Sequence, residues 1–219
     1  MRRKQWFYSV VLFCVSLSFL VLSKSFFQQQ QVPQSESALP SVSVAQQNVV
    51  LLANKDYYPV LKDHFRKAEK SIVGTVYVVK TSGFRGNEPS DLLRELIAAQ
   101  KRKVQVDLVM DISDEDKDSR DSNLRIGEQL QKAGIKIRFD TANIATHSKT
   151  FVIDGRYCFV GSHNLTHSAM AVNEELSVYM DSPEMAQKIM QFINQIPISS
   201  DPPVAGKRAS KGSVPENPE

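Results

Sequence analysis

Between residues 48 and 197 the chain alternates short apolar runs with longer stretches in which apolar residues recur every three or four positions. Short apolar runs predict buried strands, and the longer period predicts amphipathic helices. We expect strands at residues 49–52, 72–79, 104–110, 135–139, 150–153, 157–160 and 176–180, and helices at residues 58–70, 90–101, 123–133 and 183–193. This alternation indicates the α/β fold class, with a mixed, mostly parallel sheet flanked by helices.

The N-terminus has the pattern of a membrane-targeting segment. Residues 6–22 form an uncharged apolar run of 17 residues behind Arg2, Arg3 and Lys4. As a helix this run would be about 25 Å long, near the lower limit for crossing a bilayer. We therefore expect residues 1–27 to be an N-terminal apolar helix that serves as a membrane anchor or a signal peptide. The basic residues before it place the rest of the chain on the non-cytoplasmic side, which in a bacterium is the periplasm.

The remaining flanks have the composition of unstructured chain. Residues 28–47 are rich in Gln, Ser and Pro, which predicts a flexible linker. From residue 198 to residue 219, Pro, Ser, Gly and Lys predict a disordered tail. The domain that remains, residues 48–197, is long enough to bury a core of its own.

Charge and cysteine content bear on nucleic-acid binding and on disulfide formation. The formal net charge of +3 arises entirely within the first 45 residues, so the domain is neutral and its net charge gives no support to a nucleic-acid-binding face. The two cysteines are Cys14, in the apolar run, and Cys158, in a predicted strand. No disulfide can form inside the domain, and we expect Cys158 to be a small buried apolar residue.

Polar residues at fixed spacing follow the predicted strand at 135–139. His147 and Lys149 are two positions apart, and in an extended segment such residues project from the same side. A nucleophile and a cation then lie a few ångströms apart, with room for a phosphate between them. Asp154 follows after four residues, and Gly161, Ser162 and Asn164 follow after six more.

This spacing resembles the HKD motif of the phospholipase D superfamily, and the resemblance extends over about residues 49–196. It is strongest to the small members with a single motif, such as the bacterial endonuclease of the superfamily and mitochondrial Zucchini. The resemblance implies that His147 attacks phosphorus and forms a phosphohistidine intermediate that water then hydrolyses. It also implies that Glu175 orients the other ring nitrogen of His147.

The other site residues implied by the resemblance bind the phosphate. Lys149 and Asn164 would hold its non-bridging oxygens, and Ser162 would add a supporting hydrogen bond. No metal or cofactor is then required. Asp154 belongs to the motif, but Asp154-Gly155 between two apolar runs is also a hairpin signal, so a turn explains this residue equally well.

One motif supplies one nucleophile, whereas the leaving alkoxide needs a proton from a general acid on the opposite side. The resemblance implies a homodimer in which His147 of each subunit enters a shared site. His64, His163 and His167 are the alternatives within the chain.

Two rival motifs are weaker. His163 and His167 have the spacing of a zinc-binding pair on a helix, but Asn164 stands where a metalloprotease needs Glu. Asp114, Asp116 and Asp118 resemble the start of a calcium loop without its glycine, so we interpret them as a solvated acidic loop.

The loop at residues 81–89 could place Phe84 and Arg85 at the lip of the site.

Taken together, the sequence predicts a membrane-tethered, homodimeric, metal-independent phosphodiesterase. The first substrate expectation is DNA or RNA, cut by an endonuclease. The alternative is a phospholipase D that hydrolyses phosphatidylcholine or cardiolipin to phosphatidic acid, and a second alternative is a phosphate-binding module without turnover. The motif alone does not separate these substrates, because both present a phosphodiester.

Overall fold

The computed structural model describes residues 48–81 and 87–202, which belong to the compact unit Ala45–Glu219. The predicted anchor and linker, Phe84 and Arg85, and the tail beyond residue 202 lie outside the described residues. Within the described ranges, no helix combines the length and the apolar character needed to cross a membrane.

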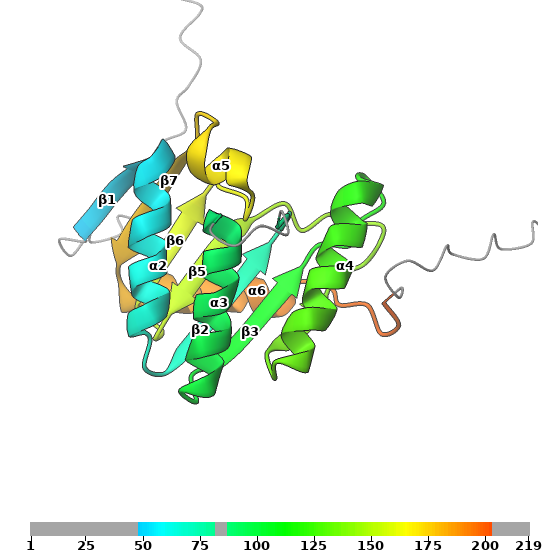
Figure 1. Ribbon diagram of the computed structural model, residues 1–219. Coiled ribbons are helices and arrows are strands. Elements are labelled where there is room, and N and C mark those ends of the chain that lie inside the picture. The colour runs from blue at the N-terminus through cyan, green and yellow to red at the C-terminus, as the bar shows by residue number, and fades with distance from the viewer. Residues whose placement is uncertain (1–47, 82–86, 203–219) are drawn as a thin grey trace, which may run out of the picture. The chain divides into compact units, whose positions relative to one another are not determined.

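A mixed seven-stranded sheet forms the centre of the domain, in the order β1-β7-β6-β5-β2-β3-β4 (Figure 1). The strands are β1 (Asn48–Ala53), β2 (Ser71–Val76), β3 (Gln105–Met110), β4 (Lys136–Phe139), β5 (Lys149–Ile153), β6 (Tyr157–Gly161) and β7 (Leu176–Asp181). The α/β class and the mixed sheet are confirmed. The expectation of a mostly parallel sheet is wrong, because only β2, β3 and β4 pair in parallel and the other neighbours are antiparallel. The physical reason is the β5–β6 hairpin, after which β7 and β1 also join antiparallel.

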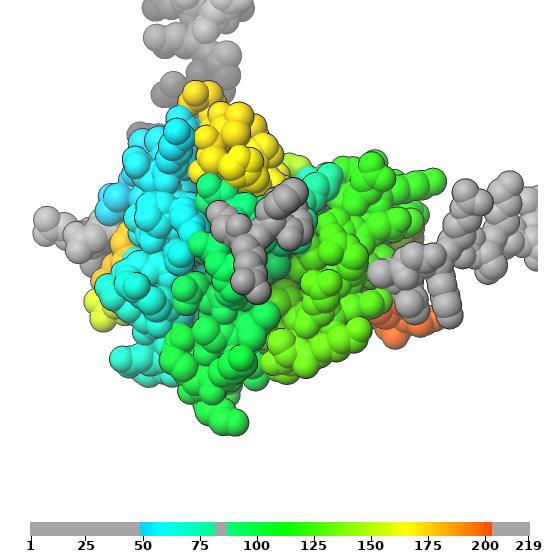
Figure 2. All heavy atoms as spheres, in the orientation of Figure 1, coloured from blue at the N-terminus to red at the C-terminus, as the bar shows by residue number. Residues whose placement is uncertain are grey.

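The helices lie on both faces of the sheet. They are α2 (Tyr57–Lys67), α3 (Glu88–Lys101), α4 (Lys117–Lys132), α5 (His167–Ala171) and α6 (Pro183–Gln195), with a 3-10 turn, η1 (Asn54–Asp56). Helices α2, α3 and α4 lie in front of the sheet in Figure 1, and α6 lies behind it. Figure 2 shows the cyan and green atoms of these three helices covering the front face. The short elements η1 and α5 were not predicted.

Helix α4 begins at Lys117 rather than at residue 123. The side chain of Asp116 accepts hydrogen bonds from the backbone N–H groups of Asp118 and Ser119, at 3.0 and 3.2 Å. Asp116 is therefore an N-cap, and the acidic stretch interpreted as a solvated loop includes the first turn of a helix.

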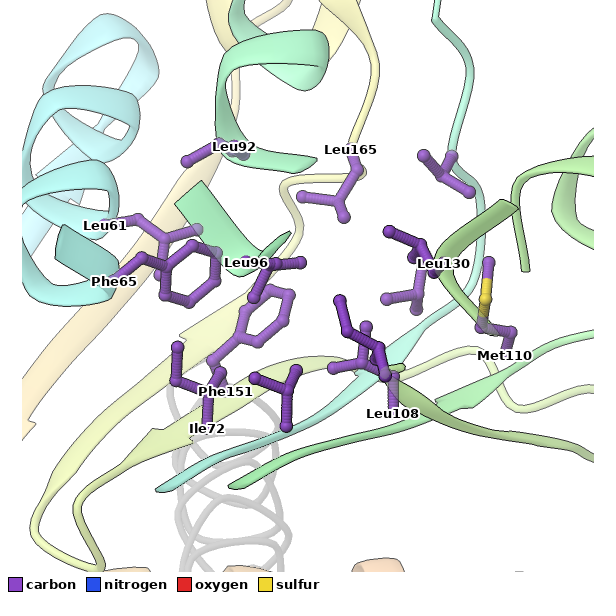
Figure 3. Close-up of a cluster of buried hydrophobic side chains, with 14 of the residues drawn as sticks. Leu61, Phe65, Ile72, Leu92, Leu96, Leu108, Met110, Leu130, Phe151 and Leu165 are labelled. Carbon is purple, nitrogen blue, oxygen red and sulfur yellow. The ribbon is translucent and has the colours of Figure 1, made fainter. Parts of the chain in front are cut away.

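The main core fills the space between the sheet and the front helices (Figure 3). Leu61 and Phe65 of α2, together with Leu92 and Leu96 of α3, are completely buried. Phe65 meets Phe151 of β5 edge to face, with ring centroids 5.1 Å apart. These contacts fix β5 at the centre of the sheet, so its first residue, Lys149, has a rigid support.

A smaller cluster lies under α6 on the other face, where Val152, Cys158 and Ala186 are fully buried. Burial raises the pKa of the Cys158 thiol to about 11. Cys158 is thus the small buried residue that the sequence predicted.

Beyond α6, Ile198 pairs with Asp140 and the Ser199 N–H donates to the Phe139 carbonyl at 2.9 Å, so the first residues of the predicted tail dock on β4.

The β5–β6 hairpin sets the register of the motif. Asp154 and Gly155 form its turn with φ of 55° and 66°, as the Asp-Gly signal predicts. At the opposite end of the hairpin Lys149 pairs with Gly161. A Cβ at Gly161 would lie 2.0 Å from Ser177 Oγ and 2.4 Å from Ser177 Cα, so only glycine lets β6 and β7 pair at this point.

We expect Gly161→Ala to destabilise the domain by about 2 kcal/mol or more, because the added methyl group must displace the β7 backbone. Urea denaturation followed by circular dichroism measures the loss. Gly155→Asn is the matched control, because its Cβ meets nothing within 4 Å and Asn tolerates positive φ. Equal stability of Gly161→Ala and the parent would show that β6 and β7 do not approach this closely.

Candidate active site

His147 and Lys149 lie where the parallel strands β2 and β3 end and β5 begins. After β4, residues 140–148 return across this edge, and His147 and Lys149 follow. Carboxyl ends of parallel strands are the usual place for sites in open α/β sheets. His147 and Lys149 therefore lie at an edge of the sheet that is suited to ligand binding.

His147 and Lys149 lie together, with Tyr77 beside them. Lys149 Nζ is 3.1 Å from His147 Nδ1 and 3.3 Å from Nε2, and it donates to the His147 carbonyl at 2.6 Å. The Tyr77 ring lies 4.1 Å from the His147 ring, and Lys149 Nζ lies 4.3 Å from the centre of the Tyr77 ring. Tyr77 was not predicted as a site residue, because it lies in an apolar run whose side chains were expected in the core.

Lys149 is a buried cation, with 7% of its surface exposed, whereas His147 is exposed. Burial lowers the pKa of Lys149, and the negative charges of Glu175 and Asp111 oppose that shift. Among the described residues, no carboxylate lies within ion-pair distance of its ammonium group. A bound anion such as phosphate would supply the missing counter-charge.

Asn164 is held by a short backbone pairing. Leu165 N–H donates to the Val78 carbonyl at 3.0 Å, and Lys80 N–H donates to the Leu165 carbonyl at 3.0 Å. Asn164 Oδ1 is buried and has no hydrogen-bond partner. A polar atom left in this state costs about 1–3 kcal/mol. The binding of a phosphate oxygen by the Asn164 side chain stays a prediction from the motif.

Ser162 and Glu175 contact each other. Ser162 Oγ donates to a Glu175 carboxylate oxygen, and Asn173 Nδ2 donates to the other at 3.1 Å. Glu175 lies close enough to Lys149 to act on its pKa, but its hydrogen-bond partners are Ser162 and Asn173 rather than His147. The orientation of the His147 ring by Glu175 stays a prediction. Glu174 points elsewhere and accepts from Asn54 Nδ2 at 2.7 Å.

Asp154 lies at the far end of β5, in the hairpin turn. Its carboxylate accepts from the backbone N–H groups of Glu69, Lys70 and Ser71, the shortest at 2.7 Å. These contacts tie the hairpin to the loop between α2 and β2. The turn explanation accounts for Asp154, and none of its hydrogen bonds leads to His147.

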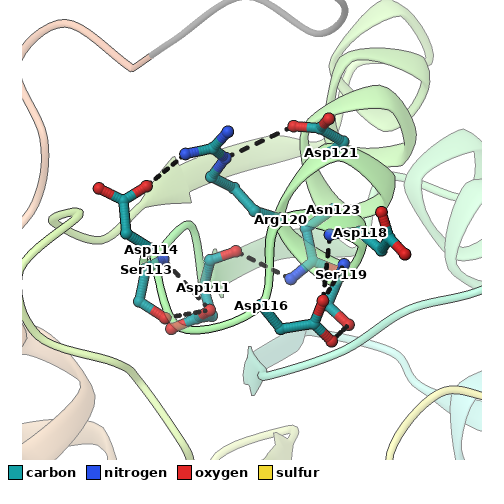
Figure 4. Close-up of polar contacts among 9 residues, drawn as sticks. All are labelled: Asp111, Ser113, Asp114, Asp116, Asp118, Ser119, Arg120, Asp121 and Asn123. Atoms are coloured by element: carbon teal, nitrogen blue, oxygen red, sulfur yellow. Dashed lines mark hydrogen bonds and ion pairs between the residues drawn. The ribbon is translucent and has the colours of Figure 1, made fainter. Parts of the chain in front are cut away.

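The buried side chain of Asn123 joins three segments around the site. Its Oδ1 accepts from Val79 N–H at 2.9 Å, and its Nδ2 donates to the carbonyls of Tyr77 at 2.7 Å and Asp111 at 2.8 Å. Figure 4 shows Asn123 on α4 beside Asp111 and the Asp116 cap. A polar residue on the buried face of a predicted helix was the signal that sequence reasoning passed over.

The other histidines are engaged in contacts of their own. His163 is buried, with Nδ1 2.7 Å from Ser177 Oγ and Nε2 2.9 Å from the Asn54 carbonyl. His64 Nδ1 lies 2.8 Å from the Val60 carbonyl, and His167 Nδ1 lies 2.7 Å from a Glu88 carboxylate oxygen. His163 precedes α5 and His167 begins it, so the two do not share a helix face as a zinc pair would.

A cavity of about 420 Å³ opens beside His147. Its apolar walls come from Ile144 in the loop and from Phe192, Ile196 and Pro197 at the end of α6. Ile144 and Phe192 are large apolar side chains that are more than half exposed, at 63% and 54%. The site is therefore flanked by an apolar surface as well as by Lys149.

The family described as "Cardiolipin synthase, PLD-like domain" matches residues 61–196, more than half of the chain. The chain therefore belongs to this phospholipase D-like family, whose superfamily acts on phosphodiesters.

Two curated relatives are similar in sequence. A cardiolipin synthase of Staphylococcus aureus is 33% identical over 81 residues, which are 36% of this chain and 16% of the relative. A mitochondrial cardiolipin hydrolase of Danio rerio is 28% identical over 128 residues, which are 57% of this chain and 53% of the relative. The chain thus spans about half or less of the length of these relatives.

Two solved structures share the fold. Nuc from Salmonella typhimurium, a phospholipase D family member, has a TM-score of 0.58 at 21% identity, covering 71% of this chain and all of its own. NucT from Helicobacter pylori has a TM-score of 0.55 at 16% identity, covering 69% of this chain and 96% of its own. At these identities the likeness establishes the fold.

We expect Asp154→Ala to lower the free energy of unfolding by about 1–3 kcal/mol, because three backbone N–H groups lose their acceptor. Turnover per folded molecule should stay unchanged. The control is Asp63→Ala, which removes only surface ion pairs to Arg66 and Lys67. A large fall in turnover with unchanged stability would return Asp154 to the catalytic residues.

Proposed function

We propose that this protein hydrolyses phosphodiesters through a phosphohistidine on His147. The observation that carries the proposal is the buried ammonium group of Lys149, 3.1 Å from the His147 ring and without a carboxylate partner among the described residues. A phosphate bound there would neutralise Lys149 and place its phosphorus next to the nucleophile. An intact nucleophile beside an anion site argues against a phosphate-binding module without turnover.

The two displacements follow from these groups. A ring nitrogen of His147 attacks phosphorus and forms the N–P bond while the P–O bond to the leaving group breaks. Lys149 and Asn164 stabilise the non-bridging oxygens as their charge grows. The leaving alkoxide takes a proton from a general acid. A water molecule, deprotonated by the same group, then attacks phosphorus and releases His147.

The general acid is proposed to be His147 of the partner subunit, in a homodimer that shares one site. Within the chain, His163 has both ring nitrogens engaged, and His64 and His167 contact Val60 and Glu88. An isologous dimer brings identical residues together across its two-fold axis. The exposed Ile144 and Phe192 beside His147 would then lie near the subunit contact.

DNA or RNA is the first substrate proposed, with the protein acting as an endonuclease. The support is the single motif on a domain of the size of Nuc, whose whole chain aligns with this one. The proposal needs no metal or cofactor, because Lys149 and Asn164 supply the charge stabilisation.

Phospholipid is the second candidate, and the cavity beside His147 favours it. Its apolar walls suit an acyl chain or glyceride better than a nucleotide. Negative charge near the site also favours phospholipid. Burial raises the pKa of Tyr77, and the nearby carboxylates of Glu115, Asp111 and Asp116 raise it further. Such charge repels a long polyanion more than a single headgroup. The substrate would be phosphatidylcholine or cardiolipin, and the product phosphatidic acid.

The proposed location is the non-cytoplasmic side of a membrane, reached through the apolar segment at residues 1–27. Arg2, Arg3 and Lys4 before that segment support this orientation. A tether would keep the site close to a lipid surface, which adds weight to the second candidate.

His147→Ala should reduce turnover by about 10³-fold or more, because the nucleophile is lost. The assay compares labelled single-stranded DNA with phosphatidylcholine and cardiolipin vesicles, all in excess EDTA. His167→Ala is the matched control, because this histidine is exposed and its ring pairs with Glu88. Residual activity above about a tenth of the parent would refute the nucleophile assignment.

Mixed dimers test the shared site. Co-expression of parent and His147→Ala chains in varied ratio should give activity proportional to the square of the parent fraction, because each site needs both histidines. Sedimentation equilibrium should show a dimer in every mixture. A linear dependence on the parent fraction would mean that each subunit has a complete site of its own.

A further inference from the structure

Two buried carboxyl groups lie directly behind the segment that carries His147. Asp111 follows β3 and Asp140 follows β4, and their exposed fractions are 3% and 1%. Asp111 Oδ1 and Asp140 Oδ2 each accept from the same backbone N–H, that of Thr146, at 2.9 Å. Thr146 immediately precedes His147, so the two carboxyl groups hold the backbone from which the nucleophile projects.

The second oxygen of each carboxyl group is engaged elsewhere. Asp140 Oδ1 accepts from Ile112 N–H at 2.7 Å. Asp111 Oδ2 accepts from Ser113 N–H at 3.2 Å and from Ser113 Oγ at 2.9 Å. Thus Asp111 Oδ1 and Asp140 Oδ2 share a single donor, the Thr146 N–H. Two buried negative charges this close repel each other, and one proton between them removes the repulsion.

The surroundings favour retention of that proton. Burial raises the pKa of Asp140 to about 6, and the charge of Asp111 adds to the rise, while hydrogen bonds from Thr146 and Ile112 oppose it. Besides Asp140, the titratable groups on which the charge of Asp111 acts are Lys149 and Tyr77. On the side of Asp140, the docked strand partner is the uncharged Ile198.

We propose that Asp111 and Asp140 share one proton and together act as positioning residues for His147. With the proton present, the pair holds the Thr146 N–H and fixes the backbone before the nucleophile. When the proton leaves, repulsion between the two carboxylates loosens this backbone. The proposal depends on the proposed function only for the role of His147, because the shared proton is measurable without any substrate.

Asp140→Asn supplies the proton permanently. Its amide nitrogen takes the place of Oδ2 and can donate to Asp111, and its oxygen can still accept from Ile112. Thr146 N–H then keeps Asp111 as its acceptor. Asp111→Asn is the second variant, because an amide there donates to Asp140 in the same way. Asp107→Asn is the matched control on β3, where the carboxylate pairs with Lys136 and Arg138 instead.

The first readout is urea unfolding of the full chain as a function of pH. Because the pKa of Asp140 is raised in the folded state, the stability it contributes is fully present below pH 3.8. That stability is lost as the pH rises through about 6. Relative to Asp140→Asn, the unfolding constant of the parent should rise about 50-fold from pH 4 to pH 7. Asp107→Asn should follow the parent. A pH-independent difference between the parent and Asp140→Asn would overturn the shared proton.

The second readout is hydrolysis of bis(p-nitrophenyl) phosphate. The ratio of Asp140→Asn to parent activity should rise between about pH 5 and pH 8, because only the parent loses the proton. A constant ratio would overturn the positioning role. Failure of both Asn variants to fold would also overturn the proposal, since each supplies the bridging N–H and leaves Thr146 one carboxylate acceptor. An inactive parent would refute the proposed function while leaving the unfolding readout decisive for the pair.

Discussion

The site depends on one constraint, the burial of a lysine ammonium group at the start of the central strand. Lys149 begins β5, which is paired with β2 and β6. Phe151 of the same strand packs against Phe65 of α2. Nζ of Lys149 lies against the His147 ring and over the Tyr77 ring. Lys149 has no ion-pair partner within residues 48–81 and 87–202, and a buried cation in that state is unfavourable unless an anion binds. The fold thus holds a buried positive charge beside the ring of His147, the residue proposed as the nucleophile.

Much of the fold followed from periodicity. All seven strands and four of the helices were predicted, because each has an apolar run or a helical period of its own. The parallel character was overestimated because strand order and direction are set by contacts distant in sequence. The start of α4 was missed because the Asp116 cap was interpreted as part of a loop. Helix α5 is only five residues long and shows no period.

The motif was predictable because its residues are close together in sequence and their spacing is specific. The groups around it were not, since Tyr77, Asp111, Asn123 and Asp140 come from separate elements and each has an ordinary explanation on its own. Only the tertiary structure shows that Asn123 ties Tyr77 to Asp111, and that Asp111 and Asp140 meet at Thr146. The surroundings of the motif, an apolar cavity and several carboxylates, were likewise not predictable from its spacing.

The covalent intermediate is the central claim, and trapping it tests that claim most directly. The full chain is mixed in excess EDTA with a phosphodiester labelled at phosphorus, quenched in alkali and digested, and the labelled peptide is sequenced by mass spectrometry. The account predicts acid-labile label on His147 and none in the His147→Ala protein. Turnover of the substrate with no label on His147, or label on another residue, would contradict it.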